Sequence, residues 1–161
     1  MYFNLYKNVL SFCDYQISDG VIHEISYDRT YGFDKYRLYD DVIDVLSRLS
    51  KGYKLLLLSD NWPSVIDFMK HYNIYDLFDK VYISSIYGQE KKDGLFFDNP
   101  INDYNIKPGE ALFIDDMEKL LDIASSKGFD VLLMDRDLSV SNSKYEVINS
   151  LEKLEDFVLF K

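Results

Sequence analysis

The sequence contains one cysteine, Cys13, and no stretch long and apolar enough for a membrane span. A single thiol excludes a disulfide framework and a cysteine zinc site within one chain. The longest purely aliphatic run, residues 55–58, is far shorter than a transmembrane helix requires. Residues 1–11 lack the basic and apolar segments of a signal peptide. We therefore expect a cytoplasmic protein with no membrane partner.

Basic residues are also scarce, since 18 Lys and Arg stand against 28 Asp and Glu, a formal net charge of -10. Such a surface repels phosphate backbones, which predicts that nucleic acid is not a partner. A bound metal can reverse the field locally and admit a small phosphorylated substrate. Hydrophobic residues make up 47% of the chain and aromatic residues 16%, a composition that favours a packed domain over disorder.

The N-terminal part gives a mixed signal. Residues 2–13 place apolar side chains at helical spacing, which predicts a helix. Residues 21–26 fit either a short helix or a strand. Residues 28–39 are rich in tyrosine, and we expect them to be mostly loop.

From residue 40 onward the pattern becomes regular. Helices are predicted at residues 42–49, 64–71, 96–104 with an interruption at Pro100, 117–127 and 149–157. Strands are predicted at residues 53–58, 81–84, 111–114 and 131–134. This alternation predicts an α/β fold with a parallel sheet. Ligands of such sheets bind outside the carboxyl ends of the strands, so polar residues at those positions are the candidates for a site.

Polar clusters follow three of the predicted strands. They are Ser59, Asp60 and Asn61 after the first, Lys91 and Lys92 beyond the second, and Asp115 and Asp116 after the third. A hydroxyl and the free N–H groups of a helix start can hold phosphate oxygens. A lysine can neutralise developing charge, and paired carboxylates can hold Mg²⁺. Taken singly, each cluster also fits a helix cap or a solvated loop, but together they predict a phosphate and Mg²⁺ site.

Three segments resemble the conserved motifs of haloacid dehalogenase-type (HAD) hydrolases. Residues 55–61 resemble motif II, residues 88–93 resemble motif III with Lys92 in place of the usual proline, and residues 111–116 resemble motif IV. The resemblance implies a three-layer α/β/α Rossmann-like core with a parallel sheet over residues 38–161. It also implies that residues 1–37 are a partial helical cap.

The resemblance assigns roles to the strand-end residues. By it, Ser59 binds the transferred phosphoryl group, Lys91 stabilises that group and the nucleophile, and Asp115 and Asp116 hold Mg²⁺. The further candidates for substrate binding are Asp60 and Asn61. The implied activity is that of a Mg²⁺-dependent phosphatase acting on a small phosphorylated metabolite, and dehalogenation is less favoured because acids stand at motif IV.

Motif I of this family, a hydrophobic strand ending in Asp-x-Asp, is not found between Met1 and Ser59. The nearest candidate makes Asp14 the nucleophile, with Gln16 at the position of the acid/base. The helical spacing of residues 2–13 favours another interpretation, in which the chain begins after its own motif I or is a degenerate relative. The chain is then a non-catalytic remnant that keeps the metal and phosphate pocket, or an interaction protein.

The missing motif has a structural consequence, because the family places the motif I strand between those of motifs II and IV. Its absence leaves two strand edges without partners, and unpaired backbone groups are costly to bury. We expect one of three outcomes. Residues 55–58 pair with residues 111–114, the N-terminal segment fills the gap, or another chain does, as in a homodimer formed through an unpaired strand edge.

Overall fold

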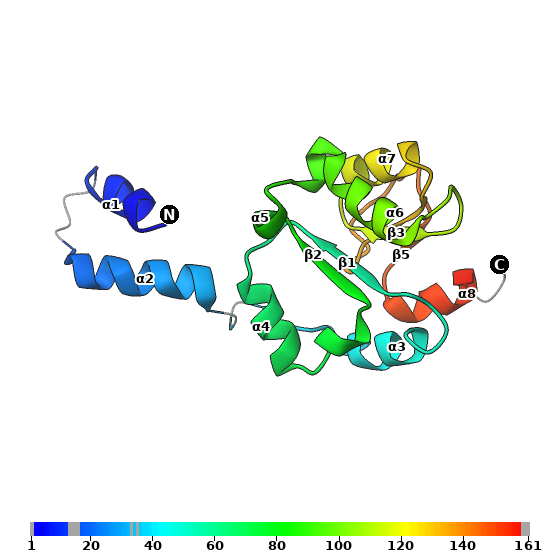
Figure 1. Cartoon of the computed structure of the whole chain (residues 1–161), viewed down its shortest axis with the longest axis horizontal. Helices are drawn as coiled ribbons and strands as arrows, with labels where there is room; N and C mark the ends of the chain where they lie inside the picture. The colour runs from blue at the N-terminus through cyan, green and yellow to red at the C-terminus, as the bar shows by residue number, and fades with distance from the viewer. Residues whose placement is uncertain (1, 13–16, 33, 35, 159–161) are drawn as a thin grey trace.

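The computed structural model describes residues 2–12, 17–32, 34 and 36–158. It begins with two helices, α1 (Tyr2–Leu10) and α2 (Asp19–Tyr31), which lie beside each other and apart from the sheets (Figure 1). The helix predicted at residues 2–13 is confirmed over most of its length. The open choice at residues 21–26 is settled as helix. Helix α2 also takes in the first four residues of the segment 28–39, which was expected to be mostly loop.

The α1–α2 pair buries little apolar surface. Ser18 caps α2 by accepting a hydrogen bond from the backbone N–H of Val21 at 3.4 Å. Between the helices, Lys7 pairs with Asp19 at 3.0 Å and the rings of Phe3 and His23 stack at 4.0 Å. Several of the large apolar side chains are exposed, namely Leu5, Val9, Phe12, Val21, Ile25, Tyr27 and Tyr31. These two helices therefore lack the apolar cover that an amphipathic pair normally has.

The remaining chain is α/β, as predicted. Its strands are β1 (Leu56–Ser59), β2 (Lys80–Ile83), β3 (Leu112–Asp115), β4 (Asp130–Met134) and β5 (Val147–Ile148). They form two parallel sheets, ordered β1-β2 and β3-β4-β5. All four predicted strands are confirmed, with shifted ends. Strand β5 was not predicted, because two residues are too few to show a period.

Helices cover the strands. The α-helices of this part are α3 (Val42–Leu49), α4 (Ser64–His71), α5 (Ser84–Tyr87), α6 (Asp98–Tyr104), α7 (Glu118–Ser126) and α8 (Leu154–Val158). Short 3₁₀ turns are η1 (Tyr75–Leu77), η2 (Lys91–Asp93), η3 (Leu95–Phe97) and η4 (Leu151–Lys153). The interruption expected at Pro100 does not occur. This proline is the third residue of α6, where a backbone N–H has no partner within the helix.

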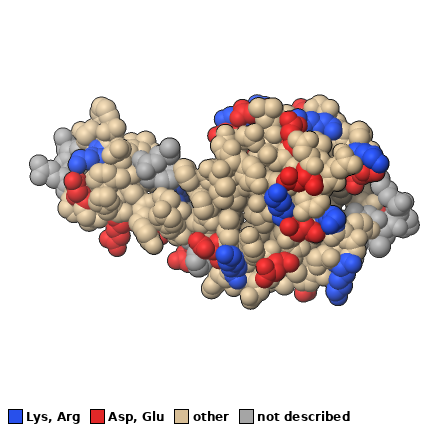
Figure 2. All heavy atoms as spheres, viewed as in Figure 1, with Lys and Arg blue, Asp and Glu red and all other residues tan. Residues whose placement is uncertain are grey.

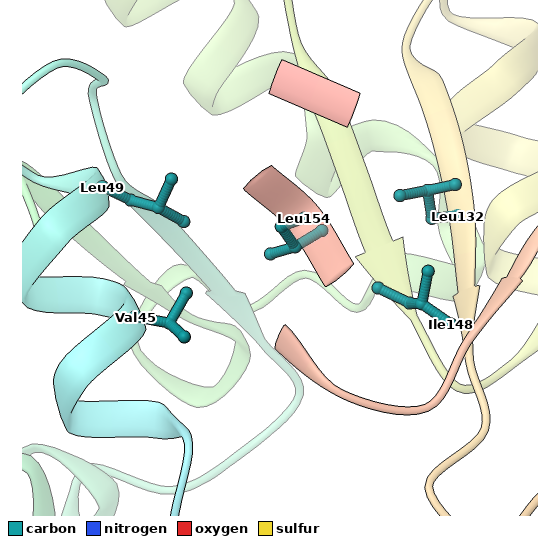
Figure 3. Close-up of a cluster of buried hydrophobic side chains, with 5 residues drawn as sticks. All are labelled: Val45, Leu49, Leu132, Ile148 and Leu154. Atoms are coloured by element: carbon teal, nitrogen blue, oxygen red, sulfur yellow. The ribbon is translucent and has the colours of Figure 1, made fainter. Parts of the chain in front are cut away.

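Two apolar clusters hold the helices to the sheets. In the first, Leu154 lies between Val45 and Leu49 of α3 on one side and Leu132 and Ile148 of the second sheet on the other (Figure 3). In the second, Phe68, Met69 and Ile74 are buried against partly buried side chains that include those of β1 and β2. The first cluster thus joins α3 and Leu154 to the second sheet, and the second joins α4 to the first sheet.

A buried ion pair fastens α3 to the second sheet. Arg136, just after β4, donates to Asp41 at 2.6 Å, and Asp41 also accepts from the hydroxyl of Ser150 at 2.8 Å and the N–H of Leu151 at 2.7 Å. The side chains of the ion pair are only 16% and 11% exposed. The ion pair between Arg136 and Asp41 is therefore largely shielded from water. Residues 95 positions apart make this contact, so local pattern gave no sign of it.

The gap left between the two sheets decides among the expected outcomes. In the described part of the chain, β1 pairs only with β2, and β3 pairs only with β4. Direct pairing of residues 55–58 with 111–114 is therefore wrong. The described N-terminal residues form helices outside the gap, so they do not fill it (Figure 1). The third outcome, a strand from another chain, stays a prediction.

The described surface agrees with the absence of long apolar runs. Within the described residues, no helix is both long and apolar enough to cross a membrane. On the face shown in Figure 2, basic side chains are scattered among acidic ones and do not gather into a patch. The expected absence of nucleic-acid partners stays a prediction.

Candidate functional site

Lys91 connects the carboxyl ends of the two sheets. It begins η2, and its ammonium lies 2.6 Å from Oδ2 of Asp115, the last residue of β3. Its backbone N–H donates to Oδ1 of Asp60, the residue after β1, at 3.0 Å. One residue therefore holds the ends of β1 and β3 at the same edge of the molecule, and both strands run toward that edge.

The Lys91–Asp115 pair is well shielded from water. The side chain of Lys91 is 12% exposed and that of Asp115 is 8% exposed. The ammonium also lies 6.0 Å from the ring centroid of Phe113, within range of a cation–π contact. The other oxygen of Asp115, Oδ1, accepts the N–H of Met117 at 3.0 Å, which fixes the turn into α7. The pair therefore has a defined geometry.

The segment after β1 contributes residues with different surroundings. Ser59 ends β1 and is partly exposed, and no hydrogen bond of its hydroxyl is seen within the described residues. Asn61, in contrast, accepts from the hydroxyl of Tyr36 at 2.6 Å and from the N–H of Trp62 at 2.9 Å through Oδ1. Asn61 therefore links the segment ahead of α3 to the loop after β1. Its side-chain oxygen is already hydrogen-bonded within the protein.

The predicted metal residues, Asp115 and Asp116, follow each other at the end of β3, and Asp116 is exposed. The described residues contain no group of three or more His, Cys, Asp or Glu placed to hold one metal ion. Mg²⁺ commonly binds through one or two carboxylates and completes its shell with waters and substrate phosphate. The two acids fit that mode. One oxygen that a metal could bind, Oδ2 of Asp115, is paired with the Lys91 ammonium.

The structure thus brings some of the predicted site residues together and leaves others apart. It joins Lys91, Asp60 and Asp115 by direct contacts, with Asp116 adjacent and Ser59 at the same edge. Asn61 is turned to Tyr36, and Asp14 lies outside the described residues. A hollow of about 1510 Å³ opens beside the site between β1 and β3, and its lining includes Asp115 and Asp116.

Asp135 was missed as a site-edge residue. It follows β4, is buried, and lines the same hollow. Hydrogen bonds from the backbone N–H of Val140 at 2.7 Å and the hydroxyl of Ser139 at 3.1 Å engage its carboxylate. The first of these is the main cause that holds the pKa of Asp135 below its ordinary value. The position of Asp135 directly after a strand could have marked it as a candidate. Its charged neighbours Arg136 and Asp137 made the segment look like an ordinary charged loop.

Comparison with known proteins agrees with this arrangement of parallel strands and strand-end polar residues. The family of haloacid dehalogenase-like hydrolases matches residues 11–128, most of the chain. The chain belongs to this family of hydrolases. A search of curated proteins finds no significant match.

Solved structures show the same fold at low sequence identity. YfnB from Bacillus subtilis, assigned as a HAD-hydrolase and bound to magnesium, is 16% identical with a TM-score of 0.78, over 95% of this chain and 69% of that one. A HAD phosphatase from Thermococcus onnurineus is 21% identical with a TM-score of 0.71, over 95% and 70%. L-2-haloacid dehalogenase from Xanthobacter autotrophicus is 15% identical with a TM-score of 0.71, over 93% and 71%. These identities establish the fold alone.

Proposed function

We propose that this chain carries the phosphate- and Mg²⁺-binding part of a HAD-type phosphatase acting on a small phosphorylated metabolite. The observation that carries the proposal is the double contact of Lys91, with Asp60 through its backbone and with Asp115 through its side chain. This contact brings all three strand-end clusters to one edge. The magnesium-bound Bacillus subtilis structure and the Thermococcus onnurineus phosphatase share the fold and support this choice.

Each residue has a defined task in this proposal. The Ser59 hydroxyl donates a hydrogen bond to a phosphoryl oxygen, and the Lys91 ammonium neutralises charge on the phosphoryl group. Asp60 is a positioning residue, because it holds the backbone of Lys91 in place. Asp115 and Asp116 hold Mg²⁺, which when bound polarises the phosphate and stabilises its negative charge. The hydrolytic step also needs a carboxylate nucleophile, as in the family, and Asp14 remains the candidate within this chain.

The open gap between β1 and β3 favours a second candidate function, which is binding of metal and phosphate without turnover. No described carboxylate enters the site from the gap, since β1 and β3 have no strand between them. A chain with a complete binding edge but no nucleophile would hold a phosphorylated ligand and leave it intact. The two candidates share one site and differ only in catalysis.

The test is Mg²⁺-dependent hydrolysis of a generic aryl phosphate by the purified chain and its Asp116→Asn variant. The matched control is Asp76→Asn, because Asp76 is an exposed acid ahead of β2, at the opposite end of the sheet. Turnover lost in the Asp116 variant alone supports the phosphatase, and Asp14→Asn is then the next variant. Mg²⁺-dependent phosphate binding without turnover, lost in the same variant, supports the second candidate. Neither result would refute the site.

A further inference from the structure

A small pocket lies between the end of α2 and the loop after β1. Its volume is about 340 Å³, and its lining includes Arg29, Tyr36, Asn61 and Trp62. Arg29 belongs to the last turn of α2, and the helix pair approaches the rest of the chain through this end of α2 (Figure 1). The volume is near the lower end of the range of about 300–1,000 Å³ that small-molecule sites occupy. The pocket therefore has room for one small chemical group.

Two of the lining residues are held in place by the sheet and helix beneath them. The backbone N–H of Asn61 donates to the hydroxyl of Ser84, directly after β2, at 3.0 Å. The ring of Tyr36 packs on Phe68 of α4, with 5.2 Å between the ring centroids. Asn61 and Tyr36 thus have set positions that do not depend on a ligand.

The side chain of Asn61 offers a hydrogen-bond donor. Its Oδ1 accepts from the hydroxyl of Tyr36 at 2.6 Å and from the backbone N–H of Trp62 at 2.9 Å. A backbone N–H can only donate, so the atom that it contacts is the amide oxygen and the other is the amide nitrogen. Within the described residues, that nitrogen makes no hydrogen bond. Its N–H groups are therefore available to an acceptor on a ligand.

Arg29 adds a positive charge to the lining. A guanidinium carries a planar fork of donors that matches a carboxylate, and hydrogen bonds between charged partners are among the stronger ones. Tyr36 and Trp62 add aromatic rings, against which a planar group can pack. Donors beside aromatic rings are the surroundings that a carboxylate on a flat apolar group requires.

The pocket lies next to the proposed phosphoryl site. Asn61 is two residues from Ser59, and two residues of extended chain span at most about 7 Å. Asp60, between them, accepts the backbone N–H of Lys91 at 3.0 Å. A ligand whose phosphoryl group lies at Ser59 and Lys91 can therefore place another group in the pocket with only a few bonds between the two.

We propose that this pocket selects the substrate by binding a carboxylate, so that the metabolite is a phosphate monoester with a carboxylate on a short planar stem. The inference rests on the proposed function, because it names the second charged group of the same substrate. Arg29 and the Asn61 amide donate to the carboxylate, while Tyr36 and Trp62 pack against the stem. A neutral ester of the same shape leaves donors unpaired, and such a loss discriminates strongly between similar ligands.

The fluorescence of Trp62 measures the binding, because this is the only tryptophan in the sequence. The purified chain is titrated, with Mg²⁺, with 3-carboxyphenyl phosphate and with its neutral isostere 3-carbamoylphenyl phosphate. We expect the carboxylate ester to bind at least ~10-fold more tightly, because the contacts that distinguish it are hydrogen bonds between charged groups. Equal affinities would overturn the inference and leave the proposed function standing.

Two variants test the donors. Asn61→Asp keeps an oxygen for the hydrogen bonds from Tyr36 and Trp62 but replaces the amide donor with a negative charge, and Arg29→Met removes the guanidinium. Each should abolish the preference for the carboxylate ester, whereas a purely structural role of Asn61 predicts no change. Arg37→Met is the matched control, since Arg37 is also exposed and is not in the described lining, and it should keep the preference. A preference that survives both variants would refute the carboxylate site.

Benzoate, which has the carboxylate and the ring but no phosphate, separates this inference from the proposed function. Suppose that benzoate binds as tightly as the carboxylate ester, with a need for Arg29 and none for Mg²⁺. The pocket then stands and the proposed phosphoryl site fails. If neither ester nor benzoate changes the fluorescence of Trp62 at millimolar concentration, the inference fails. Calorimetry with inorganic phosphate and Mg²⁺ then shows independently whether the phosphoryl site stands.

Discussion

The ammonium of Lys91 lies 2.6 Å from a carboxylate oxygen of Asp115, and the two side chains are largely shielded from water. Removing one partner of such a pair leaves an uncompensated buried charge. We therefore expect Lys91→Met to lower the free energy of unfolding by about 3 kcal/mol without divalent metal. Mg²⁺ should restore more stability in this variant than in the wild type, because the cation takes the place of the ammonium.

Thermal unfolding with and without Mg²⁺ measures both effects. Lys92→Met is the control, because Lys92 is 68% exposed and pairs with Glu90 at the surface. It should change stability by less than about 0.5 kcal/mol and leave the response to Mg²⁺ unaltered. Equal responses to Mg²⁺ in all three proteins would count against Asp115 as a metal ligand.

Ser59→Ala tests the phosphate contact. The hydroxyl has no hydrogen bond within the described residues, so its loss should change the free energy of unfolding by less than about 0.5 kcal/mol. Affinity for inorganic phosphate in the presence of Mg²⁺ should fall about tenfold, by the loss of one hydrogen bond to a charged group. Titration calorimetry measures the affinity, with Ser125→Ala in the exposed part of α7 as the control. Unchanged affinity in Ser59→Ala would remove Ser59 from the site.

The contacts of Asp41 should make the free energy of unfolding depend on pH. Burial by itself raises the pKa of Asp41, but hydrogen bonds from Arg136, Leu151 and Ser150 outweigh it and hold this pKa below the ordinary value of 3.8. A carboxyl with a lowered folded pKa contributes stability above the unfolded value and loses it as pH falls through the folded value. Asp41→Asn should therefore cost about 2–4 kcal/mol near neutral pH. The difference from the wild type should shrink only below pH 3.8.

Denaturant unfolding at a series of pH values measures this difference. The neighbouring acid Asp40 is exposed, so Asp40→Asn serves as the control and should unfold like the wild type. A difference for Asp41→Asn that already narrows between pH 7 and pH 5 would contradict the lowered pKa.

The backbone conformation of Gly128 should make its substitution destabilising. Its φ of +93° is one that L side chains rarely adopt, and an added Cβ would lie 2.9 Å from the Cβ of Pro108. Gly128→Ala should lower the free energy of unfolding by about 2 kcal/mol. Gly52→Ala is the control, because a Cβ there meets no atom within 4 Å. Chemical denaturation distinguishes them, and equal stabilities would mean that the turn before β4 relaxes without strain.

Much of the fold was predictable because many of its elements depend on residues that are close together in the sequence. The apolar spacing of α3 and the continuous apolar runs of β1 and β3 depend on near neighbours, so their periods appear in the sequence. Lys91, Asp115 and Asp116 were also predictable, because each follows a strand where α/β proteins gather their ligands. The start of α6 near Pro100 and the short strand β5 were not, since their signals are confined to a few residues.

The sequence by itself therefore determined most of the helices and strands and the order of the polar clusters along the chain, because short-range periodicity and strand-end position carry that information. Only the tertiary structure decided that Asp41 pairs with Arg136, that Asn61 accepts a hydrogen bond from Tyr36, and that β1 and β3 stay apart. These are contacts between distant segments. They depend on which edges meet when the chain folds, and residues close together in the sequence do not specify that.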